Sequence, residues 1–255
     1  MPYSFEEKLQ RANQQLQSLE GEVERWLLTN PYTITDDIDA EGDNVARITS
    51  VELPPRIVAP LIGDCLYNFR SALDHLVYAL SVKNTPNLSE AQATQTAFPV
   101  FKDPAGFHKR GMGKIRHISP AAQAIIEGLQ PYQAGHNAML ESLWLLNQLQ
   151  NIDKHRALLL TVIAQRGVNA QIPPKAHMQV LKFTAARDLT KADAEFARYR
   201  FVNIEDGTPV KMEVKPVLQI AFGNAPGEGR PVLDGLWAIR REIVGRVLSQ
   251  LRPCL

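Results

Sequence analysis

The chain has 255 residues, of which 45% are hydrophobic and 22% are charged, and its formal net charge is +1. This composition is typical of a soluble globular protein, and so small a net charge excludes nucleic-acid binding through overall charge alone. The two cysteines, Cys65 and Cys254, give neither a disulfide framework nor a zinc-binding spacing. The first residues lack the apolar core of a signal peptide, and no apolar run is long enough to span a bilayer, so we expect a cytoplasmic protein with no membrane contact.

The N-terminal region predicts a long helix. From Phe5 to Trp26 an apolar residue recurs every three or four positions, which is the period of an amphipathic helix. Ser4 with Glu7 fits a capping box at the start of this helix, and Pro31 ends it.

The following hundred or so residues predict a hairpin and further helices. Residues 32–53 contain two β-branched runs around a polar turn, which is typical of a β-hairpin. Pro54-Pro55 then opens a second long helix that runs to about Val82 with a wide apolar stripe. After it we expect a loop with a short extended piece, a short helix and a third long helix, at 83–118 (extended at 98–101), 119–129 and 137–157.

After residue 157 the apolar period changes from helical to alternating, which predicts strands. The four strands lie at 158–164, 178–184, 197–202 and 210–222. Asp206-Gly207 predicts a hairpin turn between the last two, and Pro216 places the last strand at an edge or a break. A final amphipathic helix starts at Pro231.

These elements predict an α+β fold, a bundle of long α-helices with an antiparallel β-sheet mainly in the C-terminal half. We expect a single domain over residues 1–255. The alternative is a division into a mostly helical part, 1–157, and a part with the sheet and the final helix, 158–255.

The second long helix carries many polar residues in the stretch GDCLYNFRSALDHL, residues 63–76. At about 100° per residue, the side opposite the apolar stripe collects Asp64, Asn68, Ser71 and His75. Arg70 and Asp74, one turn apart, have the spacing of an ion pair. If this polar side faces another element, its buried polar groups must have hydrogen-bond partners there. The alternative is that Arg70 and Asp74 form a solvated surface pair that contributes little to stability.

The third long helix offers a matching polar ridge, and it ends in the run NIDKHR, residues 151–156. If the two ridges face each other, they line a cleft between the helices. The cleft would contain Arg70, Asp74, His75, Asn151, Asp153 and His155. The candidate binding residues on the two helices are Asn68, Asn151, Asp153, Lys154, His155 and Arg156.

A basic run, HKRGMGKIRH, occupies residues 108–117 of the predicted loop. Its Lys109, Arg110 and Lys114 are candidates to bind the phosphates of a nucleotide or RNA, and a solvated basic loop is the alternative. The run lacks the Walker A spacing. No helix carries two histidines, or a glutamate and a histidine, at metal-binding spacing, so we expect no metal and no cofactor.

Two patterns resemble known groups of proteins. GDCLYNFRSALDHL, followed by FPVF, LQPY and NIDKHR, is similar to bacterial proteins without an assigned activity that carry an LRSALDHL-like helix and a later N-x-DKHR-like segment. This resemblance spans roughly residues 60–160. Separately, RSALDH at 70–75 resembles the R-x4-6-H pattern of the HEPN superfamily, helical-bundle proteins of which many are metal-independent ribonucleases that act as dimers. This chain departs from that family in the place of the motif, on the second long helix, and in the sheet that follows.

The HEPN resemblance implies that Arg70 would neutralise charge on an RNA phosphate and that His75 would act as a general acid or base, with Asp74 beside them. It also implies a homodimer. The expected function is therefore a metal-independent ribonuclease or an RNA-binding protein. The alternatives are a non-catalytic binding module with an anionic small molecule or a protein in the cleft, and a scaffold whose polar ridges only fix helix register.

Overall fold

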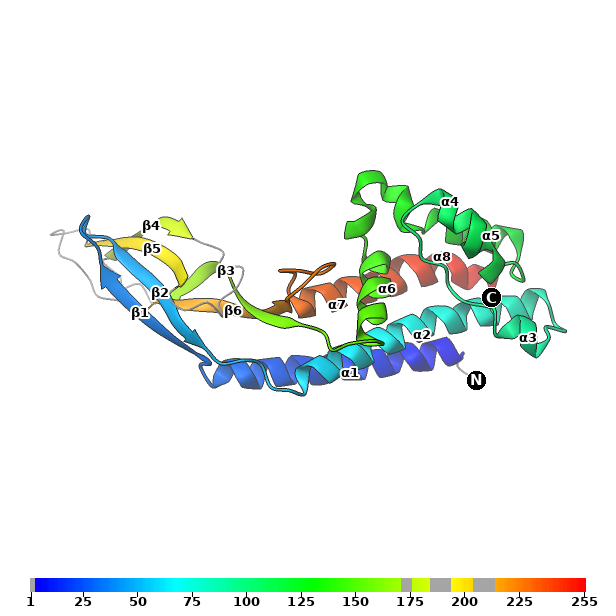
Figure 1. Ribbon diagram of the computed structural model, residues 1–255, viewed down its shortest axis with the longest axis horizontal. Coiled ribbons are helices and arrows are strands. Elements are labelled where there is room, and N and C mark those ends of the chain that lie inside the picture. Colours follow the sequence, from blue (N-terminus) through cyan, green and yellow to red (C-terminus); the bar gives the residue numbers. More distant parts are fainter. Residues whose placement is uncertain (1–2, 171–175, 184–193, 204–213) are drawn as a thin grey trace. The chain divides into compact units, whose positions relative to one another are not determined.

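The computed structural model describes residues 3–170, 176–183, 194–203 and 214–255 (Figure 1). Long helices and antiparallel strands make up the chain, with most strands in its C-terminal half, so the predicted α+β fold is confirmed. The chain forms a helical unit of Met1–Glu20, Ile57–Leu158 and Leu233–Leu255 and a sheet unit of Gly21–Arg56 and Leu159–Val232. The single domain expected from the sequence stays a prediction.

The helical unit is built on the predicted amphipathic helices, apart from residues 21–28 of the first and Val232 of the last, which belong to the sheet unit. These are α1 (Ser4–Leu28), α2 (Val58–Asn84), α6 (Ser142–Asp153) and a final helix that comprises α7 (Val232–Arg241), the π-helical η4 (Glu242–Leu248), α8 (Ser249–Leu251) and the 3-10 turn η5 (Arg252–Cys254). Their apolar stripes supply fully buried side chains, among them Phe5, Leu16, Phe69 and Leu236. In Figure 1, α2 runs alongside the first part of α1, and α6 crosses α2.

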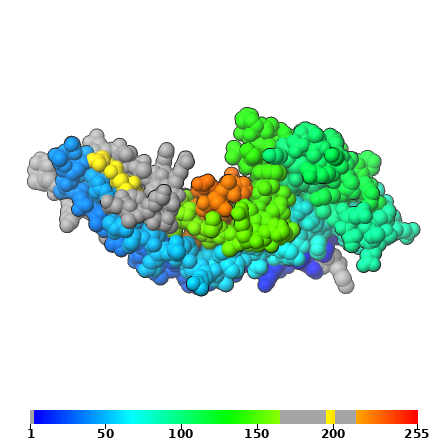
Figure 2. Space-filling view, viewed as in Figure 1, coloured from blue at the N-terminus to red at the C-terminus, as the bar shows by residue number. Residues whose placement is uncertain are grey.

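The segment between α2 and α6 is more helical than predicted. It contains α3 (Glu90–Ala93), α4 (Pro104–Gly106), the π-helical η1 (Phe107–Gly111), the 3-10 turn η2 (Met112–Lys114), α5 (Pro120–Gly128) and the 3-10 segment η3 (Pro131–Leu140). The short helix expected after Ser119 is confirmed as α5. The basic run, expected in a loop, instead lies mostly in η1 and η2, because Asp103 caps the preceding turn by accepting a hydrogen bond from the amide of Gly106 (2.6 Å). This segment forms a continuous green surface in Figure 2.

The third long helix, predicted from residue 137, begins at Ser142. Residues up to Leu140 belong to the 3-10 segment η3, and the extended Glu141 (ψ 139°) separates this segment from α6; within η3, Gly135 has a positive φ of 58°. Glycine populates this region without the steric cost that a side chain would bring.

The sheet unit contains the predicted strands in two sheets. One has the order β1 (Tyr32–Ile38), β2 (Asn44–Val51), β5 (Ala194–Asn203), β4 (Ala176–Phe183), and the other pairs β3 (Leu160–Ala170) with β6 (Val214–Phe222). All pairings are antiparallel. The hairpin predicted in 32–53 is confirmed as β1 and β2.

Among the described residues, the last two strands do not pair with each other as predicted. Asp206-Gly207 lies outside the described residues, while β5 pairs with β2 and β4, and β6 pairs with β3. A turn dipeptide indicates that the chain reverses, but it does not decide which strands pair. The edge position expected from Pro216 agrees with the structure, since β3 is the partner of β6 among the described strands. None of the described helices is long and apolar enough to cross a membrane.

Candidate functional site

Arg70 and Asp74 form a two-point ion pair on α2, and both side chains also hydrogen-bond the backbone of Phe98. Arg70 Nη2 lies 2.9 Å from Asp74 Oδ1, and Nε lies 3.3 Å from Oδ2. Arg70 Nη2 donates to the carbonyl oxygen of Phe98 (2.6 Å), and the Phe98 amide donates to Asp74 Oδ1 (2.9 Å). Only 11% of the Arg70 side chain and 33% of the Asp74 side chain are exposed. The pair therefore fastens the extended segment 98–101 to α2, which a solvated surface pair would not do.

Lys114 of the basic run lies near this ion pair, and Arg110 lies near Lys114. Burial and the positive charge of Arg70 lower the pKa of Lys114; Asp74 opposes this shift and Arg110 adds to it. The guanidinium of Arg110 stacks over the ring of Phe101, 5.4 Å from its centroid. We call Arg70, Arg110 and Lys114 the cationic cluster. The structure thus joins residues that the sequence placed in two separate candidate groups.

The cationic cluster holds one polar atom without a partner. Nη1 of Arg70 is buried and has no hydrogen-bond acceptor among the described residues. Lys109, the remaining candidate of the basic run, is exposed on the same π-helical turn as Arg110.

His75 and Asn68 face α1, which corrects the predicted cleft between α2 and α6. His75 Nδ1 lies 3.1 Å from the hydroxyl of Ser4. The Asn68 amide donates to the side chain of Gln15 and to the carbonyl oxygen of Asp64, both at 2.9 Å. Arg70 and His75 are five residues apart, which separates them by about 140° around the helix. They therefore reach different neighbours.

The end of α6 lies elsewhere along α2. Asn151, Lys154, His155 and Arg156 are exposed. The carboxylate of Asp153 lies against Gly63, where an added Cβ would meet its oxygens at 2.6 and 2.8 Å. Gly63 precedes His75 by twelve residues (75 minus 63), a rise of about 18 Å along the helix. Of the predicted polar side of α2, Asn68 and His75 contact α1, whereas Asp153 of α6 contacts α2 at Gly63.

Asp153 carries an unfavourable charge at this contact. Burial and the neighbouring carboxylate of Asp64 raise the pKa of Asp153 above its ordinary value of 3.8. The folded protein therefore holds the Asp153 proton more tightly than the unfolded chain, in which the pKa is about 3.8. As the pH rises above this value, loss of the proton lowers the free energy of unfolding.

We therefore expect Asp153→Asn to raise the free energy of unfolding at pH 7 by up to about 1 kcal/mol. The gain should fade as the pH approaches 3, where the carboxyl of the natural protein is itself protonated. Urea denaturation at both pH values measures this difference, with Glu24→Gln, an exposed position on α1, as the control. A gain that is equal at both pH values would contradict the assigned cause.

His108 on η1 and Tyr132 on η3 both contact Glu127 of α5, which the sequence did not predict. His108 Nε2 lies 3.4 Å from Oε1 of Glu127, and the hydroxyl of Tyr132 donates to the same oxygen at 3.3 Å. Burial and the charge of Glu127 raise the pKa of Tyr132 to about 12. His108 belongs to the predicted basic run, but Glu127 and Tyr132 follow on α5 and η3, and no sequence spacing links them to it.

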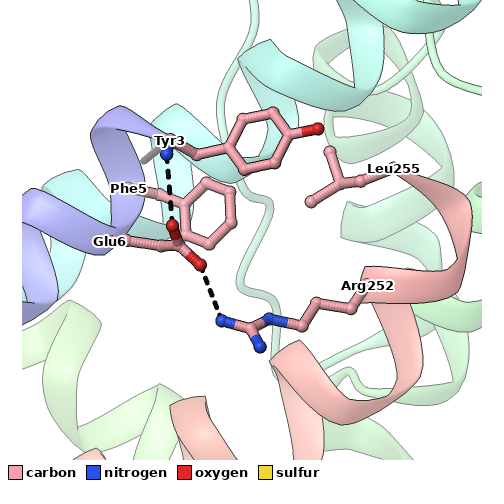
Figure 3. Close-up of a pocket in the computed structure, with 5 residues that line it drawn as sticks. All are labelled: Tyr3, Phe5, Glu6, Arg252 and Leu255. Atoms are coloured by element: carbon pink, nitrogen blue, oxygen red, sulfur yellow. Dashed lines mark hydrogen bonds and ion pairs between the residues drawn. The ribbon is translucent and has the colours of Figure 1, made fainter. Parts of the chain in front are cut away.

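A pocket of about 370 Å³ lies in the helical unit between the first turn of α1 and η5 (Figure 3). Its lining consists of Tyr3, Phe5, Glu6, Arg252 and Leu255. Oε2 of Glu6 accepts a hydrogen bond from the amide of Tyr3 (3.2 Å), so Glu6 takes the capping role predicted for Glu7. The sequence could not indicate this pocket, because its two walls lie almost the whole chain apart.

In the described part of the chain, no three histidine, cysteine, aspartate or glutamate side chains are grouped so that they could hold a metal ion. Comparisons with protein-family models, with curated proteins and with solved structures found no match to this chain.

Proposed function

We propose that the helical unit binds a phosphate-bearing ligand, RNA in the first instance, through the cationic cluster of Arg70, Arg110 and Lys114. The observation that carries the proposal is Nη1 of Arg70, which is buried without an acceptor among the described residues. A buried donor left in this state costs about 1–3 kcal/mol. A phosphate oxygen that reached this atom, once the side chains that cover it had moved, would remove this cost.

The charge around Lys114 supports an anionic ligand. Of the charged groups that act on Lys114, two are the guanidinium groups of Arg70 and Arg110, and one is the carboxylate of Asp74. This carboxylate is already engaged by Arg70 and by the Phe98 amide. An anion would offset the remaining positive charge, and the planar guanidinium of Arg110 suits two-point contact with phosphate.

The contacts of the HEPN-like residues favour binding over cleavage. Arg70 is held by Asp74 and Phe98, and His75 by Ser4. The catalytic role of Arg70 and His75 stays a prediction, and its test is RNA cleavage in the presence of EDTA. Cleavage by the natural protein that disappears in both Arg70→Ala and His75→Ala would replace the binding role with the catalytic one.

The binding proposal is tested with a short fluorescein-labelled single-stranded RNA and fluorescence anisotropy. We expect Lys114→Gln and Arg110→Gln each to raise Kd about tenfold and to lower the salt dependence of binding by about one ion. Arg11→Gln is the matched control, since Arg11 is an exposed cation on α1. Thermal unfolding of each variant shows that the fold is intact.

Two results would decide against this assignment. If Lys114→Gln and Arg110→Gln bind RNA as tightly as the Arg11→Gln control and the natural protein do, the cationic cluster is not the binding site. If inorganic phosphate displaces the RNA and longer RNAs bind no more tightly, the ligand is a small anion instead.

A further inference from the structure

The pocket in Figure 3 combines an apolar wall with two opposite charges. Tyr3 stacks on Phe5 with ring centroids 5.3 Å apart, and Leu255 lies on the same side as Tyr3. Arg252 reaches across to Glu6, and its Nη2 lies 2.7 Å from Oε1 of Glu6. The Arg252 and Glu6 side chains are 59% and 33% exposed, so a ligand can reach both charges, and it would replace their mutual ion pair.

These features restrict the chemistry of an occupant. A simple anion would be attracted by Arg252 but repelled by Glu6, and a simple cation would meet the reverse. A molecule with an ammonium and a carboxylate on one carbon offers each of the two side chains a partner of opposite charge. The aromatic and aliphatic wall beside them would cover an apolar substituent on that carbon.

We infer that this pocket binds a free zwitterionic α-amino acid with an aromatic or aliphatic side chain, independently of the ligand of the cationic cluster. The carboxylate pairs with Arg252, the ammonium pairs with Glu6, and the side chain packs against Tyr3 and Leu255. The pocket volume of about 370 Å³ lies within the range of about 300–1,000 Å³ that is usual for small-molecule sites.

The test is isothermal titration of the full chain with L-phenylalanine. N-acetyl-L-phenylalanine lacks the ammonium, L-phenylalaninamide lacks the carboxylate, and glycine lacks the apolar side chain. We expect each of these probes to bind at least about tenfold more weakly than L-phenylalanine, because each loses one of the three contacts.

Variants locate the binding. Arg252→Gln and Glu6→Gln should each raise the Kd for L-phenylalanine about tenfold. Arg241→Gln, an exposed cation on the same final helix, should leave it unchanged. Lys114→Gln should also leave it unchanged, which separates this site from the cationic cluster.

The inference is overturned if no heat is detected with L-phenylalanine at millimolar concentration, if the amide or acetyl derivative binds equally well, or if neither pocket variant weakens binding.

Discussion

Replacement of Arg70 by alanine is expected to lower the free energy of unfolding by about 3 kcal/mol. The truncation leaves the partly buried carboxylate of Asp74 without its cation and the Phe98 carbonyl without its donor. Removal of one partner from such a pair costs more than the pair itself contributes, because the other charge stays desolvated. Urea denaturation at neutral pH measures the loss.

The chain offers a close control for this experiment. Arg25 also makes a two-point ion pair, with Glu22 at 2.6 and 2.7 Å, but the Arg25 side chain is 67% exposed. Arg25→Ala should therefore cost no more than about 1 kcal/mol. Equal losses in Arg70→Ala and Arg25→Ala would mean that the clamp on Phe98 contributes nothing. The double variant Arg70→Ala/Asp74→Ala should lose less than the sum of the two single variants.

Replacement of Gly63 by alanine is the second expected effect, a net loss of no more than about 1 kcal/mol, because the atoms that a Cβ would meet are the end of the Asp153 side chain. The new Cβ would lie 2.6 to 2.9 Å from three atoms of the Asp153 carboxylate, so α6 or this side chain must move. The change also brings a gain of about 1 kcal/mol in helix propensity, which the steric clash must exceed. Urea denaturation of the variant and of the natural protein measures this difference in the free energy of unfolding.

Gly245→Ala is the matched control, because a Cβ at this helical glycine has open space within 4 Å. This variant should gain about 0.5–1 kcal/mol. In an Asp153→Ala background the loss caused by Gly63→Ala should vanish, since the clashing carboxylate is gone. A loss that persists in this background would place its origin elsewhere than at the contact between α2 and α6.

Sequence periodicity was sufficient for the elements that bury one continuous face. The apolar stripes of α1 and α2 and the β-branched runs of β1 and β2 were predicted because burial on one side leaves a repeat in the sequence. The spacing of Arg70 and Asp74 likewise predicted their ion pair, which the structure confirms.

The same reasoning could not predict partners that lie far apart along the chain. Phe98 meets Arg70 through its backbone, which carries no sequence signal. Lys114 joins Arg70 only because the segment between α2 and α6 folds back onto α2. For Asn68 and His75, helical geometry indicated a shared side of α2 but not whether α1 or α6 would cover it.

The strand order of the four-stranded sheet has a consequence for synthesis of the chain. Asn44 in β2 pairs with Tyr199 in β5, which the ribosome adds 155 residues later (199 minus 44). At about 5–20 residues per second, the newly made hairpin waits about 8–30 s for this neighbour. Throughout that interval one side of β2 presents amide and carbonyl groups that no other strand pairs, a feature that favours aggregation with other nascent chains. Translation speed across residues 52–193 should therefore govern the yield of properly assembled protein.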